Sequence, residues 1–130
     1  MRTESLRTLG LLLAITLLGA GLRLYRINEI GLSHYDAGVY AQSGLWPWTG
    51  QFHFAQGYFS PPLYPFLIGL VNAVAGSPID WAGPLISAIA ATTLIPVGFL
   101  VARGWSGERA GLMAALLLAV DPGQILFSRI

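Results

Sequence analysis

The sequence predicts an all-α membrane protein: three transmembrane helices, with juxtamembrane helices in a long first outer loop. Three observations carry this prediction. The 130 residues are 55% hydrophobic and only 10% charged, with a mean hydropathy of +0.64, whereas a soluble domain carries about 25% charged residues. Several apolar stretches have lengths that fit a bilayer. Aromatic residues, which favour the membrane–water boundary, gather between the first two of these stretches.

The first span is predicted over residues 6–24. Its uncharged core, residues 8–22, is short, but Arg7 and Arg23 flank it and can lengthen it by snorkelling. A basic start, an apolar run and a group of small residues also resemble a signal peptide, which is the alternative.

The second and third spans are predicted over residues 81–102 and 110–128. Residues 82–102 carry no charge, and at ~1.5 Å per residue they reach ~31 Å, enough to cross the bilayer core. A tight inner loop over Arg103–Arg109 connects the two. Asp121 precedes Pro122 in the third span, and this pair predicts a local break. Small residues suit close helix packing in these spans (Gly83, Ala88, Ala91, Gly98, Gly111, Ala114 and Ala115).

The arginines orient the chain, because basic residues favour the cytoplasmic side. If residues 61–76 also spanned, more arginines would lie outside than inside. If residues 25–80 stay at the outer surface, the inner side holds the larger share (Arg2, Arg7, Arg103 and Arg109). We therefore expect a cytoplasmic N-terminus. Within residues 25–80, short helices are predicted over 36–46 and 62–75, beside a run of interfacial aromatics (Trp46, Trp48, Phe52, Phe54, Tyr58, Phe59 and Tyr64).

Three stretches occur in an order that resembles a known family: "GLRLYRINEIGLSHYDAGVYAQSG", "FSPPLYPFLIGL" and "GERAGLMAALLLAVDPGQILFSR". Together they resemble the N-terminal region of GT-C-type integral-membrane glycosyltransferases, above all the protein O-mannosyltransferases and aminoarabinose transferases. The resemblance covers residues 15–130, a single membrane region. It implies either the N-terminal part of a larger enzyme or a small subunit of a membrane complex.

The resemblance implies inverting transfer of a sugar from a polyprenyl-phosphate donor to an acceptor on the outer membrane face. Phosphate leaves readily, so one carboxylate acting as general base is sufficient. Asp36 falls on the first acid of the family motif and is the candidate catalytic residue; Tyr40 falls on the motif tyrosine. Arg23 and Arg26 are candidates for binding the donor phosphate, although both also suit membrane anchoring. A divalent cation is the other group that could hold the phosphate, so no cofactor is assigned.

Three positions depart from the family pattern. Ala37 stands where the second acid is expected, Ser60 where a histidine often precedes "PPLY", and Trp81 where an arginine opens the next span. These changes favour the alternative function, a non-catalytic glycosyltransferase-like subunit that packs in a larger membrane complex.

Other classes of site and partner are disfavoured. The sequence has no cysteine and no basic run, so neither thiolate metal sites nor nucleic-acid binding is expected. His34 and His53 lack neighbouring ligands, so no metal site is predicted. The expected partners are the lipid-linked donor, membrane lipids, and the rest of the protein or other membrane subunits. The expected location is the bacterial inner membrane.

Overall fold

The computed structural model describes residues 2–33, 35–50 and 61–129, and all regular structure within these ranges is helical. The elements are α1 (Arg2–Leu24), η1 (Ile27–Glu29), α2 (Tyr35–Ser43), α3 (Trp46–Thr49), α4 (Leu63–Ala75), α5 (Ala82–Val120) and α6 (Pro122–Phe127). The chain divides into two compact units. We call Met1–Tyr25 with Ala88–Arg129 the hairpin unit, and Arg26–Ser87 the loop unit.

Two helices are long and apolar enough to cross a membrane, by length and composition: α1 with η1, over Leu6–Glu29, and α5. Helix α1 ends at Leu24, the residue at which the sequence predicted the first span to end. Arg26 takes a left-handed conformation there, with φ of 53°, which a continuing α-helix does not allow. Leucines along α1 stay exposed within the chain, as lipid-facing side chains do (Leu6, Leu9, Leu13 and Leu17).

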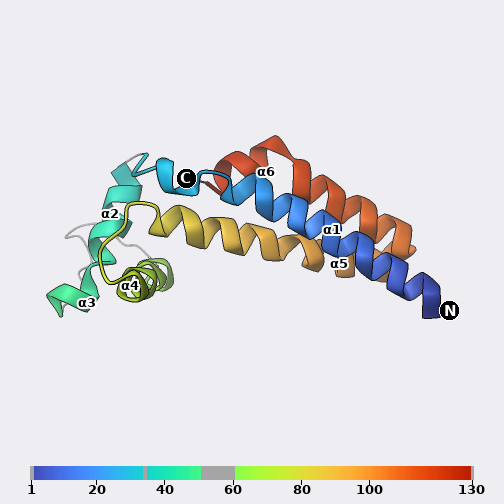
Figure 1. The fold of residues 1–130 in the computed structure, drawn as a ribbon, viewed down its shortest axis with the longest axis horizontal. Helices are drawn as coiled ribbons and strands as arrows, with labels where there is room; N and C mark the ends of the chain where they lie inside the picture. Colours follow the sequence, from blue (N-terminus) through green and yellow to red (C-terminus); the bar gives the residue numbers. More distant parts are fainter. Residues whose placement is uncertain (1, 34, 51–60, 130) are drawn as a thin grey trace. The chain divides into compact units, whose positions relative to one another are not determined.

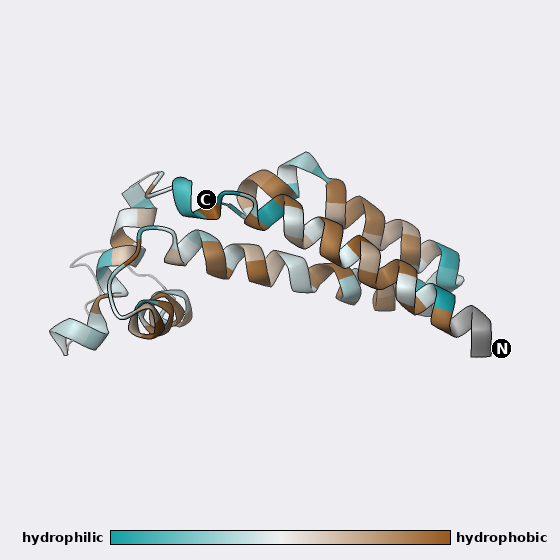
Figure 2. Cartoon of the chain, in the orientation of Figure 1, coloured by the Kyte–Doolittle hydropathy of each residue, from teal (hydrophilic) through white to brown (hydrophobic). Residues whose placement is uncertain are grey.

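Helix α5 is a helical hairpin. Its 39 residues would extend for ~59 Å, about twice the bilayer core. Gly107 breaks the helix with a φ of 85° and a ψ of 179°, and the chain then runs back along itself (Figure 1). The predicted loop over Arg103–Arg109 is therefore wrong in extent, because one non-helical glycine makes the turn. Polar residues gather at this turn, while the two arms are apolar (Figure 2).

Close packing of small residues holds the hairpin together, as the sequence predicted for this region. Ala115 and Ala119 on the returning arm contact Ile95 and Phe99 on the outgoing arm, all of them buried. A Cβ at Gly111 would lie 2.8 Å from the Phe99 carbonyl oxygen, so only glycine allows this approach. Leu12 and Ile15 pack against the same cluster, which joins α1 to the hairpin.

Replacing Gly107 by Ala is expected to destabilise the hairpin by about 1–3 kcal/mol, because its backbone conformation is nearly exclusive to glycine. The matched control is Gly104→Ala in the same helix. Nothing lies within 4 Å of the Cβ that alanine would add at Gly104, so this change should be neutral or slightly stabilising. Thermal unfolding in detergent compares the two, and equal melting temperatures would contradict the strained turn.

The third predicted helix, residues 110–128, is interrupted. Helix α5 ends at Val120, and the Asp121 carboxylate accepts a hydrogen bond of 2.7 Å from the Gln124 N–H, which caps the separate helix α6. The break expected from the Asp121–Pro122 pair is thus confirmed, but the continuous span to residue 128 is not.

The loop unit is built on α4, which packs against α2 and α3. The predicted helix over 62–75 is confirmed by α4, and the one over 36–46 is divided between α2 and α3. The Trp46 ring stacks on Phe66, with centroids 5.3 Å apart and planes 3° apart, and the indole N–H donates to the Phe66 carbonyl at 3.4 Å. A Cβ at Gly69 would overlap the Trp46 indole, so this contact requires glycine.

Gly69→Ala is expected to destabilise the loop unit by about 1–3 kcal/mol, the usual cost of forcing an extra methyl into a packed contact. Gly38→Ala on α2 is the control, because nothing lies within 4 Å of a Cβ there. Tryptophan fluorescence during denaturation follows mainly the loop unit, which holds three of the four tryptophans. If the Gly69→Ala variant unfolds at the same denaturant concentration as Gly38→Ala, or at a higher one, the Trp46 contact does not require glycine at position 69.

Candidate functional site

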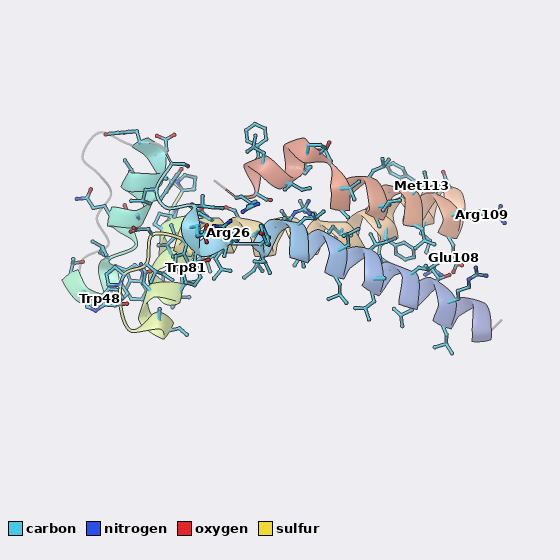
Figure 3. All side chains as sticks on the ribbon, turned by 45° about the horizontal axis from the view of Figure 1, so that its top comes forward. Arg26, Trp48, Trp81, Glu108, Arg109 and Met113 are labelled. Carbon is cyan, nitrogen blue, oxygen red and sulfur yellow. The ribbon has the colours of Figure 1, made fainter. Side chains whose placement is uncertain are left out.

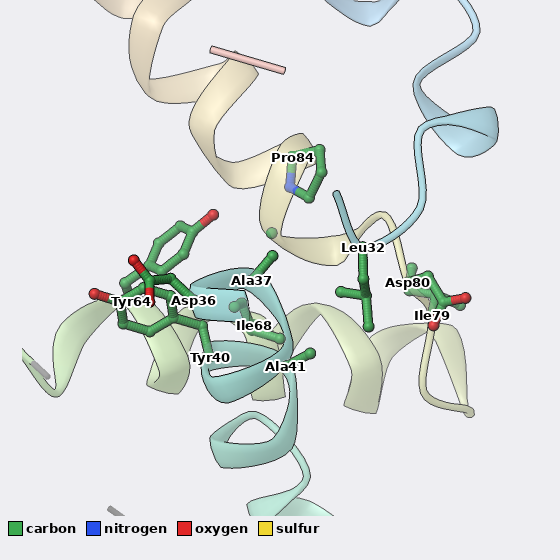
Figure 4. A pocket seen from close by; sticks show the side chains of 11 residues that line it. Leu32, Asp36, Ala37, Tyr40, Ala41, Tyr64, Ile68, Ile79, Asp80 and Pro84 are labelled. Atoms are coloured by element: carbon green, nitrogen blue, oxygen red, sulfur yellow. The ribbon is translucent and has the colours of Figure 1, made fainter. Parts of the chain in front are cut away.

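The loop unit contains a pocket of about 100 Å³ (Figure 4). Three helices contribute apolar side chains to it: Ala37 and Ala41 come from α2, Ile68 from α4, and Pro84 from the first turn of α5. These side chains make an apolar wall, and the charged side chains stand at its ends. Ligand sites have this general character, an apolar cavity with a few placed polar groups.

One end of the pocket holds Asp36, Tyr40 and Tyr64 (Figure 4). Asp36 lies in the first turn of α2, one turn before Tyr40, so the two share a helix face. The Tyr40 and Tyr64 rings meet edge to face, with centroids 5.1 Å apart and planes at 85°. The structure thus brings together two predicted site residues, Asp36 and Tyr40, and adds Tyr64.

Tyr64 is fixed from two sides. Its hydroxyl group lies 3.1 Å from Ser87 Oγ, within hydrogen-bond distance, and its ring contacts Tyr40. Burial raises the pKa of the Tyr64 phenol, while the hydrogen bond with Ser87 opposes this shift. The phenol therefore stays neutral at physiological pH and can act as a hydrogen-bond donor or acceptor beside the pocket.

The other end of the pocket holds Asp80, which no sequence pattern singled out (Figure 4). Asp80 lies 44 positions after Asp36 in the chain, and no periodicity links the two. The only available signal was its place directly before Trp81, the position that departs from the family pattern.

Asn72 holds the turn that carries Asp80. This amide is 2% exposed; its Oδ1 accepts from the Ile79 N–H at 3.1 Å, and its Nδ2 donates to the Gly44 carbonyl at 3.5 Å. A buried amide with both ends bonded specifies one local arrangement. Asn72 therefore fixes Ile79, the neighbour of Asp80, against α4.

The two candidate arginines have different environments. Arg26 belongs to the loop unit (Figure 3). Its exposed side chain forms an ion pair of 2.5 Å with Glu29. Arg23 belongs to the hairpin unit and is only 1% exposed. Its guanidinium donates to the carbonyls of Gly19 at 3.1 Å, Ala119 at 3.1 Å and Leu118 at 2.7 Å.

The bonds from Arg23 explain why this charge is buried. In a continuous helix the Leu118 carbonyl would accept from residue 122, but Pro122 has no N–H. Because α5 ends at Val120, the Ala119 carbonyl also lacks its helical partner. Arg23 supplies both bonds, and its positive charge suits a helix C-terminus. It is thus committed to holding α1 on α5, which makes Arg26 the better candidate for contacting phosphate.

Within the described ranges, no group of three or more His, Cys, Asp or Glu side chains lies close enough to hold a metal ion. Three residues considered from the sequence, His34, His53 and Ser60, lie outside the described residues.

Two helices of this chain have the length and composition of membrane spans, and the pocket lies in the loop unit. Residues 60–130, more than half of the chain, match the family described as dolichyl-phosphate-mannose-protein mannosyltransferase. The chain therefore belongs to this GT-C-type glycosyltransferase family and is an integral membrane protein. The match includes Tyr64 and Asp80, whereas Asp36 precedes it. No curated protein and no solved structure matches the chain.

Proposed function

We propose that this chain is the N-terminal part of a membrane glycosyltransferase that moves a sugar from a polyprenyl-phosphate donor to an acceptor hydroxyl, with Asp36 as general base. The observation that carries this proposal is the pocket in which Asp36 and Tyr40 lie together, in a chain of this family. Asp36 is exposed at the pocket end, where an acceptor hydroxyl can reach it.

The proposed reaction is a single displacement. Asp36 accepts the proton of the acceptor hydroxyl as that oxygen bonds to the anomeric carbon. The bond from this carbon to the phosphate oxygen breaks, and the phosphate leaves with the electron pair. The sugar carbon inverts, and the proton on Asp36 is then released to water. Arg26 contacts the phosphate from the loop unit, which offsets its charge.

We further propose the topology that this chemistry needs: an inner N-terminus, spans over α1 and the two arms of α5, and residues 25–80 on the outer side. The hairpin in α5 supports this, because a helix of ~59 Å that folds back at Gly107 provides two crossings. The apolar face of α4 suits the membrane surface, since it leaves Leu63, Phe66, Leu70 and Val74 exposed.

A non-catalytic subunit is the second candidate. It is favoured by Ala37, which gives the pocket a methyl group where the family pattern has an acid. In that case the pocket would have a structural role only, and the chain would copurify with fixed membrane partners.

The test uses the full-length protein in lipid vesicles with dolichyl-phosphate-mannose and, separately, a nucleotide sugar. The proposal predicts transfer from the lipid-linked donor only, with inversion at the anomeric carbon. No transfer from either donor, together with constant-stoichiometry partners, would favour the subunit. Adding EDTA to the same assay tests whether a divalent cation joins Arg26 at the phosphate.

A further inference from the structure

The pocket has an apolar middle and charged ends, a distribution that matches the polar and apolar parts of one class of ligand. Asp36 and Asp80 stand at opposite ends of the same cavity, with Ala37, Ala41 and Pro84 between them (Figure 4). A pyranose ring has the same pattern, because its C–H faces are apolar and its hydroxyl groups lie around the rim. The Asp80 carboxylate can accept a hydrogen bond from a hydroxyl at one edge of such a ring, while Asp36 at the other end stays available for the acceptor hydroxyl.

The pocket has room for more than a single water molecule. Its volume of about 100 Å³ is several times the roughly 10–15 Å³ that one water molecule needs. Ala37 and Gly83 keep the cavity open, since larger side chains at these pocket-lining positions would occupy it. A Cβ at Gly83 would already lie 3.0 Å from the Tyr64 hydroxyl oxygen. The Tyr40 and Tyr64 rings offer apolar aromatic surface at the Asp36 end.

Hydrogen bonds on both sides of Asp80 hold the turn in which it lies. Asn72 bonds the Ile79 backbone and the Gly44 carbonyl at once, so the turn before α5 is tied to α4 and to the end of α2. The Ala82 N–H donates to the Ile79 carbonyl at 3.2 Å, which closes the turn around Asp80. A carboxylate on a turn held in this way can act as a fixed acceptor.

We propose that this pocket is a sugar-binding subsite and that Asp80 binds the sugar, accepting a hydrogen bond from a hydroxyl on the edge of the ring opposite Asp36. The proposal rests on the proposed function for the class of ligand. It assigns the carboxylate that Ala37 does not provide to a residue in the turn before α5.

The test separates binding from turnover in the full-length protein. Donor affinity is measured in the Asp36→Asn background, which is expected to bind without turning over, using dolichyl-phosphate-mannose and a series of its monodeoxy analogues. Adding Asp80→Asn should weaken binding of the intact donor by about 10- to 100-fold, the effect of losing a hydrogen bond to a charged group. With one deoxy analogue, which lacks the bonded hydroxyl, the same substitution should have almost no effect.

Ser77→Ala is the control, because it changes an exposed side chain in the same turn without touching the pocket. Equal losses with the intact donor and with every analogue would overturn the proposal, since a merely structural change would weaken all of them alike. Unchanged donor affinity in the Asp80→Asn variant would also overturn it, whatever Asp36 does. Asp36→Asn with wild-type turnover would instead contradict the proposed function, while the affinity series would still decide the role of Asp80.

Discussion

Replacing Arg23 by Met is expected to lower the free energy of unfolding of the hairpin unit by about 2–4 kcal/mol. The substitution keeps an unbranched apolar stem but leaves the Leu118 and Ala119 carbonyls without donors, and each buried unsatisfied carbonyl costs about 1–3 kcal/mol. Because Arg23 is buried within the chain, water has little access to replace these bonds. Arg23→Lys should recover part of the loss, because one ammonium group can reach only part of what the planar guanidinium reaches.

Arg7→Met is the matched control, because Arg7 is exposed on the same helix and should change stability by less than about 0.5 kcal/mol. Both variants are compared with wild type by unfolding in mixed detergent micelles. If Arg23→Met and Arg7→Met have the same free energy of unfolding, Arg23 does not hold α1 to the end of α5.

The helices of this protein were predictable because their signals are local. Uncharged apolar runs predicted α1 and the two arms of α5, and the Asp121–Pro122 pair predicted the break before α6. The exact turn was not predictable: "RGWSGER" contains two glycines, and only the backbone shows that Gly107, not Gly104, leaves the helix. The role of Arg23 was equally hidden, since a flanking arginine has the same sequence pattern whether it reaches lipid headgroups or the carbonyls of another helix.

Some residues of the pocket were predictable from the sequence and others were not. Asp36 and Tyr40 were predictable together because they are one helical turn apart and fall on a family motif. Tyr64 was noted only as an interfacial aromatic, and Asp80 was not selected at all, because both reach the pocket through tertiary packing. One bond of the Asn72 side chain, to the Gly44 carbonyl at the end of α2, joins two helices that are close in the sequence. Its second bond, which holds the turn before α5, depends on the path of the chain after α4.

Asp36→Asn is expected to reduce the rate of sugar transfer by about 10²- to 10⁴-fold, the usual contribution of a general base. The amide has the shape of the carboxylate but cannot accept the proton of the acceptor hydroxyl. Asp36→Glu should retain partial activity, because it keeps the base and shifts it by one methylene. Glu108→Gln is the control: this acid lies at the hairpin turn, where it accepts from Thr8 Oγ1 at 3.1 Å, outside the loop unit.

The most direct test is a single-turnover experiment on full-length Asp36→Asn with dolichyl-phosphate-mannose already bound. We expect the variant to hold the donor with wild-type affinity and to transfer the sugar at least about 100-fold more slowly than Glu108→Gln. Transfer at the wild-type rate from the bound donor would contradict the assignment of Asp36 as the base.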